Sequence, residues 1–373
     1  MRLAHSTSTR RASSRAGLGK EEPVIPSENH EVNLRPVGKG CQEQVYLPTV
    51  PRLRRCSVFT VWLLLALAAP RTGHGQGLPE LAPINPVATA RSGLYFQPYR
   101  NRAPGRWVTA LSLDYASIIE YNPPPPGDYV LDAEVMRFSL DVARDLTPHT
   151  FIAVRTSVEG AYAGFMDGFL DWYHGLLGIR IKEREQRPRD QFLYGITLPD
   201  GTGVRRAPSN LFLQDLRVGL GVRHTPQLQS VLSLTLPTAT GPDGYGKGVL
   251  SIGVLNTFRL PLHPRLIYEG GFGLGFTPRH GSLQECQRET FATASSGLRI
   301  GIWDRQSLFG NVFYHSPYYH DTTLPALDRK ELSLDFGWIL RTRRGGEWRV
   351  GMTEDLEPGG PAVDLVFRFG RSF

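Results

Sequence analysis

Charged residues recur at alternate positions in several stretches of this sequence, and they are the best candidates for chemistry. In each stretch the intervening positions are apolar, so a β-strand would carry the charges on one face. Facing the lumen of a barrel, they would suit a path for polar solutes, because lipid penalises charge on the outer face. Ion pairing across the lumen is the alternative. The residues are Asp215, Arg217, Arg223, Glu269, Arg299, Asp335, Arg341 and Arg368.

A second group of polar side chains lies in an aromatic segment. Asp167, Asp171 and His174 offer oxygen and nitrogen ligands for a divalent cation. Their spacing matches no metal-site motif. A loop anchored by Trp172 and its aromatic neighbours, with the polar groups in water, is the favoured interpretation, and no metal is predicted.

Two further patterns resemble catalytic motifs only superficially. His315 and Ser316 are a base and a nucleophile, but adjacent strand residues point to opposite faces of a sheet. Gly271, Gly273 and Gly275 alternate along a strand with no helix after them, so they are no phosphate loop. They would instead make room inside a narrow lumen. The sequence therefore predicts neither an enzyme nor a cofactor.

The elements that hold these residues are β-strands, and period-2 alternation predicts twelve of them. Aromatic and aliphatic side chains occupy one face of most of them, as a lipid-facing barrel strand requires. The predicted strands are 106–121, 129–145, 151–163, 211–224, 228–236, 249–259, 266–276, 290–303, 307–316, 331–342, 347–355 and 362–373.

The connections between these strands alternate between long and short. With the C-terminus placed in the periplasm, the inner turns are all short and the outer loops longer, as in bacterial barrels with an even strand number. Residues 164–210 form the longest outer loop, and Phe192–Leu198 is assigned to it because a thirteenth strand would break the parity. A transmembrane antiparallel up-and-down β-barrel is thus predicted, against the alternative of a soluble sandwich.

The C-terminal strand is also the predicted assembly signal. Phe367, Phe369 and Phe373 fall on its apolar face, and a terminal aromatic residue is typical of outer-membrane proteins. The expected partners are outer-membrane lipid and the barrel assembly machinery, with small molecules as cargo.

The basic balance of the chain belongs to its first part. Of 42 Lys+Arg and 35 Asp+Glu, residues 1–75 hold 11 and 5, which leaves 31 and 30, or +1, for the remainder. Nucleic-acid binding is therefore not predicted. Residues 51–75 match a signal peptide, with basic residues before a 12-residue apolar run and Gly73 and Gly75 at the cleavage site. Residues 1–50 are interpreted as an extended leader or a misassigned start, and the Pro-rich residues 76–105 as a periplasmic lead-in to the barrel at 106–373.

A resemblance to a known family lies mainly in the irregular segment. Residues 164–178, together with Gln186-Arg-Pro-Arg-Asp-Gln-Phe192, resemble an uncharacterised family of Gram-negative outer-membrane proteins, a numbered domain of unknown function (DUF3187-like). The resemblance implies an exported barrel in the bacterial outer membrane and brings no known catalytic residue.

Taken together, these patterns predict a passive channel or pore for small molecules, apolar ones included. A non-conducting barrel that displays loops for structure or adhesion is the alternative, and an outer-membrane enzyme is a distant third. Residues 164–190 are too apolar for a hydrated loop. We expect them to fold into the lumen and narrow it, with Asp167, Asp171, Trp172 and His174 as constriction residues. The competing account is an external lid, or contact with a partner or with the lipid surface.

Overall fold

The computed structural model describes residues 77–122, 127–178, 187–242, 244–343, 345–357 and 363–373. They belong to one compact unit that spans Arg54–Phe373. The predicted leader and signal peptide lie outside the described residues, so both stay predictions.

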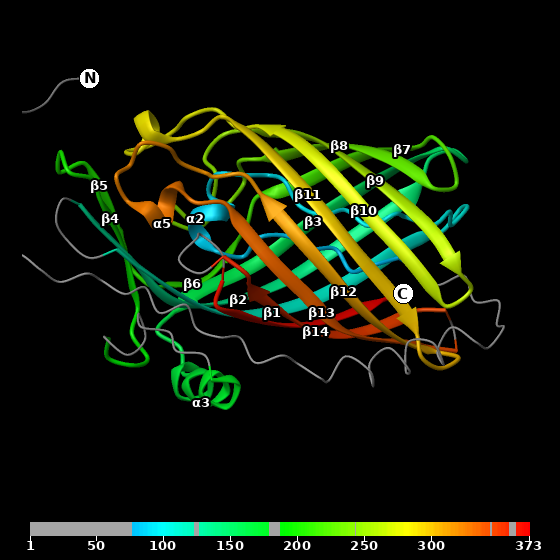
Figure 1. Cartoon of the computed structure of the whole chain (residues 1–373). Helices are drawn as coiled ribbons and strands as arrows, with labels where there is room; N and C mark the ends of the chain where they lie inside the picture. The colour runs from blue at the N-terminus through cyan, green and yellow to red at the C-terminus, as the bar shows by residue number, and fades with distance from the viewer. Residues whose placement is uncertain (1–76, 123–126, 179–186, 243, 344, 358–362) are drawn as a thin grey trace, which may run out of the picture. The chain divides into compact units, whose positions relative to one another are not determined.

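Twelve strands form a closed ring, as predicted. All neighbours pair antiparallel in chain order, and β1 pairs with β15 to close the ring (Figure 1). Closure leaves no open strand edge in the ring. The barrel strands are β1 (Trp107–Asn122), β2 (Asp128–Asp145), β3 (Thr150–Tyr162), β7 (Leu216–Arg223), β8 (Leu228–Leu236), β9 (Ser251–His263), β10 (Leu266–Phe276), β11 (Thr290–Gly301), β12 (Gln306–His315), β13 (Glu331–Arg341), β14 (Glu347–Asp355) and β15 (Leu365–Ser372).

Three shorter strands belong to the long loop between β3 and β7. β4 (Leu193–Thr197) pairs with the first residues of β2, Asp128–Asp132. β5 (Gly203–Arg206) pairs with β4, and β6 (Ser209–Leu213) pairs with β3. They extend the sheet beyond the ring, so Phe192–Leu198 is confirmed as part of the loop. We call this end of the barrel the long-loop end and the opposite end, which holds the C-terminus, the short-turn end.

The outward face of the ring is an apolar belt. Its side chains come from alternate positions of the strands and are about 37–63% exposed. A surface of this size and composition is unfavourable in water and stable in the hydrocarbon of a bilayer. Its exposed members include Leu113, Phe138, Leu220, Leu232, Val254, Phe272, Leu274, Leu308, Val350 and Phe369.

The membrane is crossed by this belt of strands. Among the described residues, no helix combines the length and the apolar character needed to span a bilayer.

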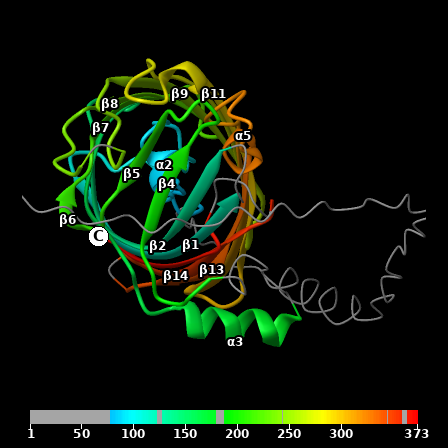
Figure 2. The same cartoon turned by 90° about the vertical axis from the view of Figure 1, so that its left-hand side faces the viewer.

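The predicted constriction is wrong. Part of the segment forms helix α3 (Asp167–Leu177), which lies outside the ring (Figure 2). Its N-cap residue Met166 and its Leu170 are buried against Leu365, and the Phe169 ring lies at a tilt to Phe367 with centroids 5.7 Å apart, on the outward face of β15. The segment is apolar, as the sequence indicated, but it covers the outer wall of the barrel rather than the lumen.

Polar contacts fix α3 to the outer wall. Glu134, on the outward face of β2, accepts the backbone N–H of Phe165 at 2.8 Å and that of Met166 beside the helix start. At the other end Tyr173 donates to Glu354 at 3.0 Å, and His174 lies 3.5 Å from Asp364. A carboxylate at a helix N-terminus is stabilised by unpaired N–H groups, which lets an otherwise costly charge sit on this wall.

The side of α3 turned away from β15 is largely exposed, although Phe165 and Phe169 at its edge still contact Tyr115 and Phe367. Phe165, Phe169, Trp172 and Leu176 are 73%, 41%, 62% and 70% exposed and fall at helical spacing on one side. They continue the apolar belt of the strands.

We therefore expect Trp172 to lie in lipid when the protein is reconstituted in vesicles. The difference in emission between the wild-type protein and Trp172→Phe reports this residue alone. The emission assigned to Trp172 in this way should be blue-shifted and should be quenched by brominated phospholipids, because the ring faces the acyl chains. Red-shifted emission quenched instead by aqueous acrylamide would show that α3 stands off the membrane.

Candidate functional site

The lumen of the barrel is occupied by the chain's own N-terminal segment. Residues 77–101, which we call the plug, were predicted to lie outside the barrel as a periplasmic lead-in, and that placement is wrong. The plug is a hairpin whose two limbs are joined by α2 (Pro86–Thr89) and by an antiparallel bridge between Leu81 and Phe96. Figure 2 shows α2 within the ring of strands.

Both limbs of the plug meet the barrel wall at the short-turn end. Leu78 N–H donates to Glu269 at 2.7 Å, and Arg299 donates to the carbonyl of Gly77 at 3.2 Å. On the returning limb, Tyr99 O–H donates to the carbonyl of Thr225 at 3.0 Å. The hairpin therefore enters and leaves through one mouth.

The turn of the hairpin reaches the long-loop end. The Asn85 side chain caps α2 by accepting the N–H of Val87 at 2.9 Å and also donates to Glu120 of β1. Lys247, from the loop between β8 and β9, donates to the carbonyl of Thr89 at 2.7 Å. Burial lowers the pKa of Lys247 to about 8, although Asp215 at 4.0 Å favours its charged form.

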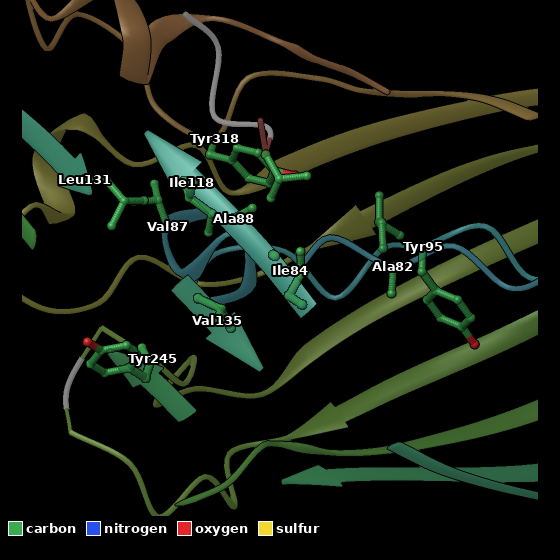
Figure 3. Packing of buried hydrophobic residues seen from close by; sticks show 14 of the residues in the cluster. Ala82, Ile84, Val87, Ala88, Tyr95, Ile118, Leu131, Val135, Tyr245 and Tyr318 are labelled. Atoms are coloured by element: carbon green, nitrogen blue, oxygen red, sulfur yellow. The ribbon is translucent and has the colours of Figure 1, made fainter. Parts of the chain in front are cut away.

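The outer loops pack over α2 as an apolar lid. Figure 3 shows Val87 and Ala88 of α2 near Ile118, Leu131 and Tyr318, all of them buried. Lid residues come from β4 and from the loops after β8, β10 and β12, including the short helix α5 (Pro325–Asp328). They are Tyr194, Ile196, Tyr245, Leu283, Tyr318, Tyr319, Leu324, Ala326 and Leu327.

Side chains of the strands satisfy the irregular backbone of the ascending limb. Arg137 donates to the carbonyls of Pro83 at 2.6 Å and Ala82 at 3.2 Å. The carboxylate of Glu80 pairs with Arg155 and lies 3.3 Å from Arg217. Buried backbone groups without partners are costly, so these inward arginines stabilise a segment that has no ladder of its own.

The descending limb is held in the same way. Arg91 donates to the carbonyl of Arg288 at 2.9 Å, in the loop after β10. His315 of β12 lies 2.7 Å from the Ser92 hydroxyl, and Thr257 of β9 donates to the carbonyl of Gln97. Gln229 of β8 completes the pattern by donating to Pro98 and accepting from Arg100 N–H at 2.8 and 2.9 Å.

The inward glycines make room for the plug. A Cβ atom at Gly253 would lie 2.7 Å from Leu94 of the plug, and one at Gly275 would lie 2.9 Å from the same side chain. Beside them, Gly271 faces Phe96. The predicted role of Gly271 and Gly275 in a narrow lumen agrees with these contacts, but their neighbour is the plug and not residues 164–190. Gly273, predicted with them, faces Thr293 and Leu255 of the neighbouring strands instead.

The eight inward charges are all engaged in ion pairs. Arg217 contacts Glu80, and Arg223 pairs with Asp145 at 2.6 Å. Asp215 pairs with Lys247 of the loop between β8 and β9, the others pair within the ring, and Arg368 bridges two carboxylates. Their contacts are Asp215–Lys247, Glu269–Arg259, Arg299–Glu347, Arg341–Glu347, Arg368–Asp114 and Arg368–Asp335. The alternative of structural ion pairing thus describes this conformation, and a role in lining a conducting path stays a prediction.

A cavity of about 420 Å³ remains beside the plug at the short-turn end. Its apolar wall includes Leu78, Tyr99, Phe151 and Phe309. Its charged wall combines arginines from the strands and the plug with carboxylates: Glu80, Arg100, Asp114, Asp141, Asp145, Arg155, Arg223, Asp335, Arg341, Arg349 and Arg368. The volume is within the range of pockets that hold small organic molecules.

The three residues that offer metal ligands in the aromatic segment lie on the outer wall of the barrel. Asp167 accepts the N–H of Asp190 at 2.6 Å, Asp171 pairs with Arg189 at 2.6 Å, and His174 contacts Asp364. Within the described part of the chain, no cluster of three or more His, Cys, Asp or Glu is arranged to hold a metal ion.

The two residues that resembled a catalytic base and nucleophile make structural contacts. His315 stacks on Tyr318 with ring centroids 4.2 Å apart, and the Ser316 hydroxyl accepts the N–H of Ala292. Of the residues predicted as the assembly signal, Phe369 and Phe373 are exposed, at 46% and 56%, while Phe367 is covered by α3. Their role in assembly stays a prediction.

A family model matches residues 56–373, described as "Protein of unknown function (DUF3187)". The chain belongs to the DUF3187 family. A comparison of this DUF3187 protein with curated proteins finds no match.

Solved structures similar to the DUF3187 chain include an outer-membrane channel and a transporter. The COG4313 outer membrane channel from Pseudomonas putida F1 is 11% identical, with a TM-score of 0.46 over 74% of this chain and 98% of that one. A Pseudomonas aeruginosa FadL homologue is 10% identical, with a TM-score of 0.39 over 80% and 99%. The Pseudomonas putida toluene transporter TodX is 8% identical, with a TM-score of 0.36 over 72% and 89%.

Packing of the plug against inward glycines is testable by substitution. Gly253→Val places two methyl groups against Leu94, so it should destabilise the docked plug by about 1–3 kcal/mol. The measurement is the rate at which an added protease cleaves residues 77–101 in the reconstituted barrel. Leu94→Ala in the same chain should restore protection, since it vacates the space that valine needs. Equal cleavage in all three proteins would show that the glycines do not seat the plug.

Proposed function

We propose that this DUF3187 protein is an outer-membrane channel for small molecules whose lumen is closed by the plug. The apolar belt, the even strand number and the long-loop and short-turn ends are those of a Gram-negative outer-membrane barrel, and the predicted signal peptide supports export. In this orientation the short-turn end faces the periplasm.

The plug is the observation that carries this proposal. A barrel with only a structural role can fill its interior with the side chains of its own strands. A ring of twelve strands is wide enough that its interior needs a further filling or leaves room for a solute. Here the filling is a hairpin of separate chain, held through hydrogen bonds and ion pairs, with both limbs at one mouth. Such a segment can leave without breaking the strand ladder, and its departure opens a charged lumen.

A sealed, non-conducting barrel is the second candidate. The lid favours it, because Tyr129, Leu131, Tyr318 and Leu327 are fully buried at the long-loop end and close that mouth as a small core. Passage through the channel requires this lid to move as well as the plug.

Permeability of the barrel without its plug decides between the two functions. Liposomes that contain a chain lacking residues 77–101 should swell in small neutral and charged solutes several-fold faster than liposomes that contain the full chain. A synthetic peptide of residues 77–101, added from the short-turn side, should slow the swelling again.

The matched control is a chain in which a Gly/Ser linker replaces residues 165–178. Because α3 lies on the outer wall, this variant should keep the low permeability of the full chain. All three barrels must show heat-modifiable migration on gels, which verifies closure. A closed barrel without residues 77–101 that stays impermeable would reject the channel.

A further inference from the structure

The arginines of the short-turn cavity outnumber the carboxylates that face them. Glu347 illustrates the imbalance, because one carboxylate faces Arg299 at 2.9 Å, Arg349 at 3.6 Å and Arg341 at 3.9 Å. Only the Arg299 contact is within hydrogen-bond distance. The charges of Arg341 and Arg349 are therefore weakly compensated, and both side chains line the cavity.

Guanidinium nitrogen atoms without a hydrogen bond also belong to residues that line this cavity. Arg349 Nε, Arg368 Nη1 and Arg223 Nη1 are buried and have no hydrogen-bond partner among the described residues, although Arg368 Nη1 lies 3.6 Å from Asp335. All three residues line the cavity. A buried N–H donor without an acceptor is unfavourable, and more so when it carries charge, so a ligand that accepts from these atoms is stabilised there.

The carboxylates of the cavity do not cancel this surplus. Asp141 and Asp145 pair with Arg100 and Arg223, and the latter contact is 2.6 Å long. Asp114 is shared by Arg137 and Arg368 at 3.0 and 3.2 Å. Glu80 pairs with Arg155, and Asp335, whose Oδ2 has no hydrogen-bond partner among the described residues, lies 3.6 Å from Arg368. Each acidic side chain of the cavity is thus near at least one arginine, which leaves Arg341 and Arg349 as the side of the cavity open to an anion.

The cavity is also partly apolar and reachable. Tyr99, Phe151 and Phe309 form its apolar wall, and the side chain of Arg341 is 26% exposed, so it lies toward the mouth. We propose that this cavity binds a small organic carboxylate, with the apolar part against the aromatic wall and the carboxylate on the forks of Arg341 and Arg349. Arg368 Nη1 donates to the same group from deeper in the lumen.

A planar carboxylate matches these donors because a guanidinium fork binds it with two parallel hydrogen bonds. This proposal rests on the proposed channel function in one respect: the bound carboxylate is then the cargo. The site itself requires only the cavity and its arginines.

Binding to the full chain in nanodiscs tests the proposal, with benzoate as the probe and benzyl alcohol and benzylamine as its neutral and cationic counterparts. Isothermal titration should show benzoate binding at least tenfold tighter than either. Arg349→Gln should weaken benzoate by about tenfold, since it removes one charged hydrogen-bond donor. The fold should survive, because Glu347 keeps its 2.9 Å pair with Arg299.

The matched control is Arg305→Gln, which changes an exposed arginine in the turn between β11 and β12 at the same end of the barrel. It should leave benzoate affinity unchanged. Equal binding of the three probes, or equal loss in both variants, would overturn the site. Inorganic phosphate that displaces benzoate at equal concentration would overturn the assignment to carboxylates.

Flux separates this proposal from the channel function. Benzoate binding that Arg349→Gln weakens, in a barrel that stays impermeable without residues 77–101, would refute the channel and leave the site intact. Permeability to benzyl alcohol and benzoate at equal rates, with no measurable binding, would support the channel and refute the site.

Discussion

The structure depends on one constraint: polar backbone groups inside a membrane barrel must find partners within the protein. The strands meet it by closing into a ring, because each ladder then has a neighbour on both sides. The plug has no ladder beyond the bridge of Leu81 and Phe96, so its N–H and C=O groups depend on inward side chains such as Arg137, Gln229 and Glu269. This need explains why polar residues with long side chains alternate along the inner faces.

The same constraint shapes the electrostatics of the lumen. Arginines that donate to plug carbonyls remain charged, and carboxylates must lie nearby to compensate them, as Asp114 does for Arg137. The balance is different at the short-turn end, where the single carboxylate of Glu347 faces three guanidinium groups. The lid at the other end follows a different principle and is stabilised by burial of aromatic and aliphatic side chains.

Local periodicity was enough to predict the ring but not its contents. Alternation in stretches such as Leu266–Phe276 fixes both the strand and the direction of each side chain, so strand bounds and inward charges could be predicted. The plug has no period, since its prolines interrupt any regular pattern, and its buried positions depend on contacts with residues 35 to 223 positions away in sequence. One signal was available, because Leu78, Leu81, Ile84, Val87 and Leu94 make this segment too apolar for a hydrated lead-in.

The error over α3 has a related cause. Apolarity of residues 164–178 correctly excluded a hydrated loop, yet burial in the barrel and contact with lipid both remove apolar side chains from water, and composition does not distinguish them. The lumen was already filled by a segment that local patterns did not reveal. Glu134, an acidic residue on the lipid-facing side of β2, was the local exception that marked the docking point on the outer wall.

The hairpin form of the plug has a topological consequence. A single extended chain through the lumen would have to thread one end past the lid before it could leave, and its return would require the same passage. A hairpin with both limbs at the short-turn end can be withdrawn through that end, with its turn leaving last. No end of the chain then has to pass through the lumen. Insertion and withdrawal can then follow the same path, and the outer mouth need not open for the plug itself to move.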